Sequence, residues 1–446
     1  MRTVVIPEKK SFPDIFVLLP IFALCIDLFT PFLIWKNVLP AAIRWGSHAA
    51  ILIMIMVSIL RMLSFNHIPR FFWLFVAISL TWSYVALGQG QGIPSTVWGV
   101  WVLFQFPLVY LFIYLQPNIP EQFPIYVRRY GLILLGVEVI IQLLQYFAGE
   151  IPGDQLAGLF GENGTGNAVI FEILICCICL GYWMTSKRWF GVVIALVLSG
   201  LSSVLGEMKL FPIVITLIGI IAVFVYAIEN RSLSKFFVYS GLIFTVLVGF
   251  AYLYNIVVPS ASETPLQTYI TDPSSLFTYL TRTESYYKGE GVTYTDIGRA
   301  AAVEIGWNSL QKDPVTFLFG YGIGSRSESR TLGTAGVALT TGGLGVSVGT
   351  SLLVVMQEMG LIGLVVLGGI YIGIILSLVR DIRKNPSSRA VELRYALLFF
   401  SCLWPVYLFY ASVLLMRVPM LLYWALLGYV FAESHVPMIN IKKVSA

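Results

Sequence analysis

The feature that most constrains this chain is a series of apolar stretches, each near the roughly 20 residues that a helix needs to cross a bilayer. The 446 residues are 58% hydrophobic and only 11% charged, whereas soluble domains carry about 25% charged residues. We therefore predict an all-α integral membrane protein. Its twelve candidate spans cover 15–35, 46–64, 70–88, 95–115, 131–148, 167–185, 189–206, 209–228, 236–254, 349–379, 395–413 and 417–433.

One long polar stretch, from about Asn255 to Val348, interrupts this series and holds six of the 28 Lys and Arg residues. Loops tolerate variation and carry functional sites, so a membrane protein with a single large loop is expected to use it. We predict one polytopic membrane domain over residues 1–446, with 255–348 as a large loop between the ninth and tenth spans. No internal repeat or separate soluble domain is visible.

The distribution of cations predicts the topology, because cytoplasmic loops are enriched in Lys and Arg. If the N-terminus is cytoplasmic and the spans alternate, 18 of the 28 cations lie inside: Arg2, Lys9, Lys10, Arg61, Arg70, Arg128, Arg129, Lys187, Arg188, Arg231, Lys235, Arg380, Arg383, Lys384, Arg389, Arg394, Lys442 and Lys443. We therefore predict cytoplasmic termini and an extracytoplasmic long loop. The net charge of +5 is explained mostly by these cytoplasmic cations and does not indicate a nucleic-acid partner.

Glu207 and Lys209 lie at the expected outer ends of two spans, directly before an apolar run. In one interpretation they form an ion pair that marks a turn. In the other, Lys209 faces an anion at the outer membrane surface, where a lipid-linked pyrophosphate would lie. Pro212 fits a helix that begins here, and the N-terminus of such a helix would add positive potential.

A second group of candidate residues lies in the long loop. Asp296, Arg299 and Glu304 fall in the stretch Thr295–Leu310. The recurrence of Arg299, Val303, Gly306 and Leu310 at helical spacing predicts an amphipathic helix at the membrane surface there. Arg299 either contacts solvent and lipid headgroups or binds substrate. A carboxylate within hydrogen-bond reach of an acceptor hydroxyl is the usual general base, so both acids are candidates.

Glycines alternate at Gly320, Gly322 and Gly324, which predicts a tight turn or a close approach of backbones. Arg326 and Arg330 follow directly. Two arginines beside such a backbone are suited to clamp phosphate oxygens through bidentate hydrogen bonds, although a solvated loop fits either one equally well.

Polar residues within or between the spans each allow two interpretations. Arg417, before the last span, is either an interface anchor or a further pyrophosphate contact. Others either form hydrogen bonds between helices or belong to a proton or ion relay; they are Asp27, Glu138, Gln142, Gln145, Glu172 and Glu358.

Several short motifs, in order, resemble the O-antigen polymerase and O-antigen ligase superfamily. Ser351–Leu367 contains Glu358-Met-Gly-Leu-Ile-Gly363, which is similar to the Glu-x-Gly-Leu-Ile-Gly core of that group. The loop series from Arg299 through Trp307 and Asp313-Pro to Phe319–Gly324 resembles its outer-loop signature. Glu207-Met-Lys209 falls where members often carry Arg or Lys after a short outer turn. The resemblance covers about 150–380 and the layout of twelve spans.

The resemblance implies a GT-C-like membrane enzyme that acts on undecaprenyl-pyrophosphate-linked oligosaccharides at the outer face of the bacterial inner membrane. Ligases of the group typically carry a His a few residues before the Glu-x-Gly motif, where this chain reads Val348-Gly-Thr-Ser351. The missing His favours an O-antigen or exopolysaccharide polymerase over a ligase. A flippase and a chain-length regulator are the implied partners. No metal-ligand constellation is visible, so the prediction includes neither metal nor cofactor.

The site predicted on this basis holds the departing diphosphate with fixed cations, since such groups best stabilise developing charge in a dehydrated site. The cations are Lys209, Arg299, Arg326, Arg330 and Arg417, and the candidate bases are Glu207, Asp296 and Glu304. Two other functions stay open: a ligase that transfers glycan to lipid A–core, and a multi-pass transporter. Transporters often contain inverted repeats, which this sequence does not display.

Overall fold

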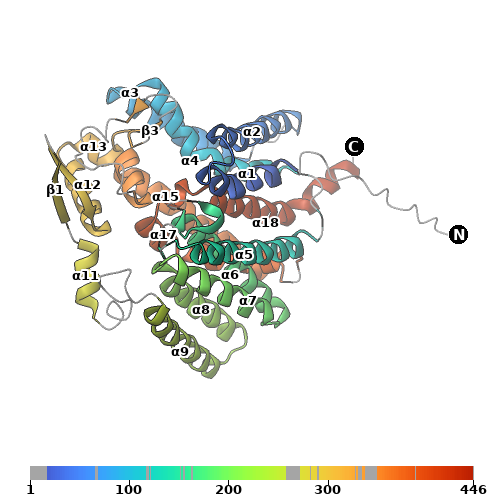
Figure 1. Cartoon of the computed structure of the whole chain (residues 1–446). Helices are drawn as coiled ribbons and strands as arrows, with labels where there is room; N and C mark the ends of the chain where they lie inside the picture. The colour runs from blue at the N-terminus through green and yellow to red at the C-terminus, as the bar shows by residue number, and fades with distance from the viewer. Residues whose placement is uncertain are drawn as a thin grey trace.

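The computed structural model describes residues 18–65, 69–116, 120, 122–150, 152–153, 156–161, 164–257, 272–281, 283–288, 291–326, 328–329, 334–336, 349–386 and 388–444. Helices dominate this part of the chain (Figure 1). They are α1 (Leu18–Trp35), α2 (Trp45–Phe65), α3 (Arg70–Gly88), α4 (Ile93–Tyr114), α5 (Phe123–Phe147), α6 (Thr165–Ser186), α7 (Phe190–Leu205), α8 (Leu210–Glu229), α9 (Leu233–Val257), α15 (Ser351–Lys384), α16 (Val391–Cys402), α17 (Trp404–Tyr410) and α18 (Arg417–Val444), with short 3-10 turns η2 (Ala41–Arg44), η3 (Gly158–Phe160) and η4 (Val413–Leu415).

Among the described residues, eight helices are long and apolar enough to cross a membrane, or nine if the bent pair α16 and α17 forms one span. The prediction of a multi-span helical membrane protein is therefore confirmed, whereas the count of twelve spans stays a prediction. Eleven of the twelve predicted ranges overlap one helix each, and 395–413 covers the bent pair α16 and α17. Helix α7 is apolar but has only 16 residues. At about 1.5 Å per residue it is shorter than the roughly 30 Å bilayer core.

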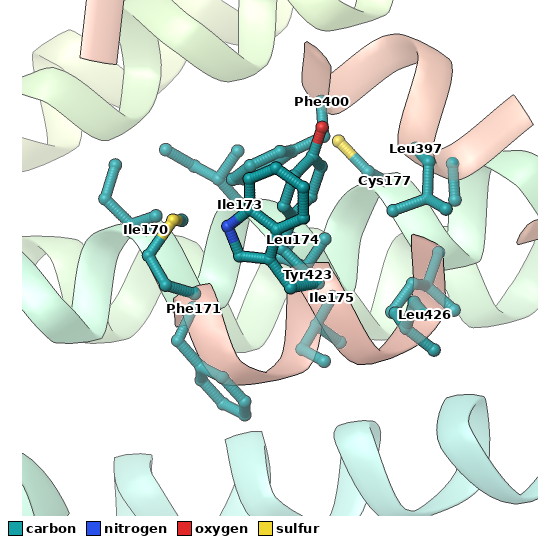
Figure 2. Packing of buried hydrophobic residues seen from close by; sticks show 14 of the residues in the cluster. Ile170, Phe171, Ile173, Leu174, Ile175, Cys177, Leu397, Phe400, Tyr423 and Leu426 are labelled. Atoms are coloured by element: carbon teal, nitrogen blue, oxygen red, sulfur yellow. The ribbon is translucent and has the colours of Figure 1, made fainter. Parts of the chain in front are cut away.

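Helix α6 forms the centre of the bundle. Its sequence is apolar on nearly every face, and a helix of this kind is buried rather than amphipathic. It packs most extensively along α16 and also contacts α7, α8 and α18. Figure 2 shows Phe171, Leu174 and Cys177 of α6 in one packed cluster with Phe400 of α16 and Tyr423 of α18. The middle of α6 is therefore held by buried side chains from α16 and α18.

The described part of the long loop lies at one end of the bundle, opposite the C-terminal end of α18 (Figure 1). Its elements are α11 (Pro273–Thr281), β1 (Thr283–Lys288), β2 (Gly291–Ile297), α12 (Arg299–Leu310), α13 (Pro314–Phe319), β3 (Glu328–Ser329) and β4 (Thr334–Ala335). Strands β1 and β2 form an antiparallel hairpin rich in Tyr and Thr, residues that favour strands. A helix was expected in Thr295–Leu310; α12 confirms it from Arg299 on, whereas the residues up to Ile297 belong to β2. Helix α12 packs with α13 against α15.

The alternating glycines bring backbones into close contact, as their sequence predicts. Gly320, Gly322 and Gly324 have φ values of 73°, 88° and 85°, in the left-handed region that favours glycine. A Cβ on Gly322 would lie 2.2 Å from the backbone of Ala86 on α3. The run also meets α15 where that helix is kinked at Gly360, whose φ is 64°. This close approach anchors the loop segment to the bundle.

Candidate functional site

A cavity of about 560 Å³ lies at the end of the bundle where the loop segment begins α12. Helix ends and turns, rather than helix centres, form most of its wall. The lining residues are Gly153, Thr165, Gly166, Asn167, Val169, Gly206, Glu207, Met208, Lys209, Leu210, Arg299, Gly349, Tyr410, Ala411, Ser412, Leu415 and Met416. We call it the cationic cavity, because Lys209 and Arg299 outnumber Glu207, the single acid in this described lining.

The turn between α7 and α8 brings Glu207 and Lys209 to this cavity. Glu207 has a φ of 51°, a left-handed conformation that is uncommon for a residue with a side chain. The turn is held by backbone hydrogen bonds, including one of 2.8 Å from the Met208 N–H to the Ser203 carbonyl. A Cβ on Gly153 would lie 3.6 Å from Glu207 Oε2, so the carboxylate rests against that backbone. Backbone strain concentrated at a cavity of this kind is typical of functional sites.

Arg299 joins the loop segment to the end of α17. It is the first residue of α12, after Gly298. Its Nε donates a 2.7 Å hydrogen bond to the Tyr410 carbonyl, and the guanidinium carbon lies 4.0 Å from the centroid of the Tyr410 ring. Such a cation–π contact contributes about 0.5–2 kcal/mol. The two contacts together fix the orientation of the guanidinium at the cavity wall.

Non-helical backbone separates α17 from α18 beside the cavity. The Ala411 carbonyl accepts a 2.9 Å hydrogen bond from the Ser351 N–H, and Ser351 Oγ accepts another of 2.9 Å from the Leu414 N–H. The Ser412 hydroxyl donates to the Gly349 carbonyl. Irregular backbone at membrane depth is tolerated where protein groups satisfy it or where it lines a polar cavity. Here residues at the start of α15 satisfy this backbone with hydrogen bonds, and the same backbone also lines the cationic cavity.

Five helices begin at or next to the cationic cavity. Thr165, Leu210 and Arg299 are the first residues of α6, α8 and α12 and lie in its wall, while Gly349 and Met416 of the wall precede α15 and α18. Each helix N-terminus presents backbone N–H groups and carries about half a positive charge. The sequence predicts this contribution only for α8. The combined field makes the cavity suited to a polyanion.

A row of polar side chains on α5 binds the backbone around η3, which precedes α6. We call it the α5 stripe; its members are Glu138, Gln142 and Gln145, none more than 4% exposed. Glu138 accepts a 2.7 Å hydrogen bond from the Leu159 N–H, and Gln145 accepts one of 3.1 Å from the Gly158 N–H. Gln142 donates to the Leu156 carbonyl at 3.0 Å. These bonds run from a helix to the loop before α6, whereas the sequence suggests bonds between helices or a relay.

Two other acids in the spans do join helices. Asp27 of α1 accepts a 2.7 Å hydrogen bond from the Ser47 hydroxyl of α2. Glu172 of α6 accepts one from the Ser202 hydroxyl of α7. For these two residues the expectation of hydrogen bonds between helices is confirmed.

Arg417 begins α18 next to the cationic cavity, but its side chain turns toward α1 and α2. Its Nε donates to Asp27 at 2.8 Å, and a terminal nitrogen donates to the Ser47 hydroxyl at 2.8 Å. The other terminal nitrogen lies 2.9 Å from His48 Nε2. Arg417 is not among the described residues that line the cavity. Its contacts fix the start of α18 to α1 and α2.

Arg326 occupies a separate, buried position beside α15. Its backbone N–H donates to Glu358 at 3.0 Å, and its guanidinium donates to the Gln357 side-chain oxygen at 2.5 Å. Burial lowers the pKa of the guanidinium, and the charge of Glu358 opposes that shift. The described lining of the cationic cavity does not include Arg326. The arrangement therefore joins the glycine-rich run to the kink in α15.

The remaining predicted residues do not gather at the cavity in the part of the chain that the structure describes. Glu304 is exposed on α12 and is not in the cavity wall. Asp296 pairs with Glu284 in the β1–β2 hairpin, and its side chain lies outside the described residues. Arg330 also lies outside them.

The cavity contains polar residues that the sequence reasoning missed. Thr165 and Asn167 lie in the first turn of α6, and Tyr410 ends α17. The available signals were a polar start to an apolar run and a proline, Pro405, in the broken span. The assembled groups are suited to hold an anionic headgroup at the end of the spans.

No protein-family model matches the chain, and no curated protein sequence matches it.

Proposed function

We propose that this protein is a polysaccharide polymerase, which transfers a growing glycan from undecaprenyl pyrophosphate to a lipid-linked repeat unit. The observation that carries the proposal is the cationic cavity, where Lys209, Arg299 and five helix starts meet at the end of the spans. An anionic lipid headgroup would lie at that depth. The motifs that resemble the O-antigen polymerase and ligase superfamily supply the reaction class.

The chemistry assigns roles to the cavity residues. The acceptor hydroxyl oxygen forms a bond to the anomeric carbon of the donor, and the bond from that carbon to the diphosphate oxygen breaks. The electron pair leaves with the diphosphate, whose growing charge Lys209 and Arg299 stabilise. The hydroxyl proton passes to a base. Among the three candidate acids, Glu207 is assigned this role because it lines the cavity.

The proposal includes a place in the cell. Both termini lie in the cytoplasm, and residues 255–348 form an extracytoplasmic loop of a twelve-span protein in the bacterial plasma membrane. The excess of cations in the short loops on one side supports this orientation. In this orientation the cationic cavity faces the outer surface, where a flippase would deliver lipid-linked repeats. A chain-length regulator is the further expected partner.

The direct test is chain extension by the purified protein in proteoliposomes that contain a lipid-linked oligosaccharide repeat. Wild-type protein is expected to produce a ladder of longer glycans. Lys209→Ala and Arg299→Ala should each slow extension about 10²-fold or more. Lys312→Ala is the matched control, because Lys312 is an exposed cation outside the described cavity wall. Unchanged extension in both cavity variants would remove the site assignment.

The product distinguishes this proposal from the two alternatives. A polymerase leaves the extended glycan on lipid pyrophosphate, whereas a ligase leaves it on lipid A–core when that acceptor is supplied. Uptake of a substrate into proteoliposomes without any glycan product would indicate a transporter. The absence of a His between Val348 and Ser351 favours the polymerase over the ligase.

A further inference from the structure

A second hollow of about 400 Å³ lies along α7, α8 and α9, with a contribution from the end of α6. We call it the apolar groove. Helix α8 contributes positions from Phe211 to Val223, and α7 and α9 form its sides. Helix α9 packs along α8 and touches α7 much less. The groove therefore lies between α7 on one side and the α8–α9 pair on the other, where the contacts between helices are few.

The groove begins on the first turn of α8, next to residues that line the cationic cavity. Lys209 and Leu210 line the cavity, and the next two residues, Phe211 and Pro212, line the groove. From Phe211 the groove follows α8 through twelve further positions to Val223, which is about 18 Å of helix at 1.5 Å per residue. A molecule with its head in the cavity would thus have an apolar path that starts on the first turn of α8.

The side chains that line the groove are mainly apolar, so a hydrocarbon chain can pack against them. The Thr216 hydroxyl donates a 2.7 Å hydrogen bond to the Pro212 carbonyl within α8. Gly200 on α7 leaves room for a larger side chain, since a Cβ there would be in ordinary contact, 3.4 Å from Phe250 of α9. Gly219 on α8 instead allows α9 to approach closely, because its Cβ would lie 3.0 Å from Ile243. Burial of methylene groups in such a site is favourable at roughly 0.8 kcal/mol each.

We infer that the apolar groove holds the hydrocarbon chain of the lipid whose diphosphate occupies the cationic cavity. The inference rests on the proposed function for the identity of that lipid. It commits to the substrate rather than to bulk phospholipid, because the groove begins at Phe211, two residues after Lys209 of the cavity wall. The groove then adds affinity for the lipid carrier, independent of the sugars attached to it.

The first test maps contact without turnover. The full-length protein in phospholipid nanodiscs is irradiated with undecaprenyl diphosphate that carries a photoreactive diazirine near the middle of its chain. Adducts are expected on groove residues of α7, α8 and α9, and excess unlabelled undecaprenyl diphosphate should remove them. A diazirine phospholipid should not compete for these positions. Adducts spread evenly over lipid-facing helices would overturn the inference.

The second test fills the groove. Gly200→Leu and Val193→Trp, both at groove-lining positions of α7, should each weaken binding of undecaprenyl diphosphate about tenfold, the effect of excluding roughly two methylene groups. Gly241→Leu is the matched control on α9, since nothing lies within 4 Å of the added Cβ. A diphosphate with a short, water-soluble prenyl chain should bind the wild-type and both groove variants equally. Thermal unfolding of each variant identifies any loss of folded protein.

These outcomes separate the two proposals. If the groove variants lose long-chain affinity but no lipid-linked repeat is ever polymerised, the groove stands and the polymerase proposal fails. If polymerisation proceeds and both filled variants retain wild-type affinity for the long-chain diphosphate, the groove inference fails. Lys209→Ala should weaken long-chain and short-chain diphosphates alike, because it acts on the head.

Discussion

Arg299 and Tyr410 form the contact whose loss is easiest to interpret at the scale of single residues. Arg299→Lys keeps the charge but loses both the Nε hydrogen bond to the Tyr410 carbonyl and the planar face that lies on its ring. We expect glycan extension to fall about 10-fold to 10²-fold, less than for Arg299→Ala. The measurement is the initial rate with a lipid-linked repeat. Equal rates for wild type and Arg299→Lys would mean that charge alone matters there.

The glycine-rich run offers a residue-scale test that separates strain from crowding. Gly322→Ala introduces a Cβ 2.2 Å from the Ala86 backbone at a φ of 88°. Strain and overpacking each cost about 1–3 kcal/mol, so unfolding should become easier by about 2–6 kcal/mol. The control is Gly90→Ala, with a φ of 80° and nothing within 4 Å of the new Cβ. Thermal unfolding in detergent should rank Gly322→Ala well below Gly90→Ala; similar losses would contradict the close approach.

At the scale of elements, the α5 stripe connects one helix to the backbone that precedes α6. Glu138→Leu removes the acceptor of the buried Leu159 N–H, and a buried unsatisfied donor costs about 1–3 kcal/mol. We expect lower thermal stability and slower glycan extension, because the first turn of α6 lines the cationic cavity. Glu138→Gln retains an acceptor oxygen at this position and serves as the control. If both variants resembled wild type, the stripe would not position α6.

Helix boundaries show which elements the sequence alone predicts. The range predicted for the third span, 70–88, coincides with α3, and the ranges 189–206 and 209–228 correspond to α7 and α8. These elements follow from length and hydropathy, which are local properties. The β1–β2 hairpin was missed, because its pattern is short and lies in a polar segment. The break between α17 and α18 follows from tertiary hydrogen bonds to α15.

At the scale of the whole molecule, the predicted orientation is testable in intact cells. A cysteine at Asn308, exposed on α12, should react with a membrane-impermeant maleimide added outside. A cysteine at Arg188, exposed between α6 and α7, should react only after the membrane is opened. Wild-type protein provides the background from its own thiols. The reverse pattern would place the cationic cavity on the cytoplasmic side and contradict the polymerase proposal.

The sequence by itself determined that this chain is a multi-span helical membrane protein, because hydrophobicity and span length are properties of contiguous residues. It also singled out Glu207, Lys209 and Arg299, which share the cationic cavity. Only the tertiary structure decided that Arg326 pairs with Gln357 and Glu358 of α15 and that Arg417 turns toward α1 and α2. Five helix starts meet at one cavity through packing around α6, and no local pattern encodes contacts between residues so distant in the chain.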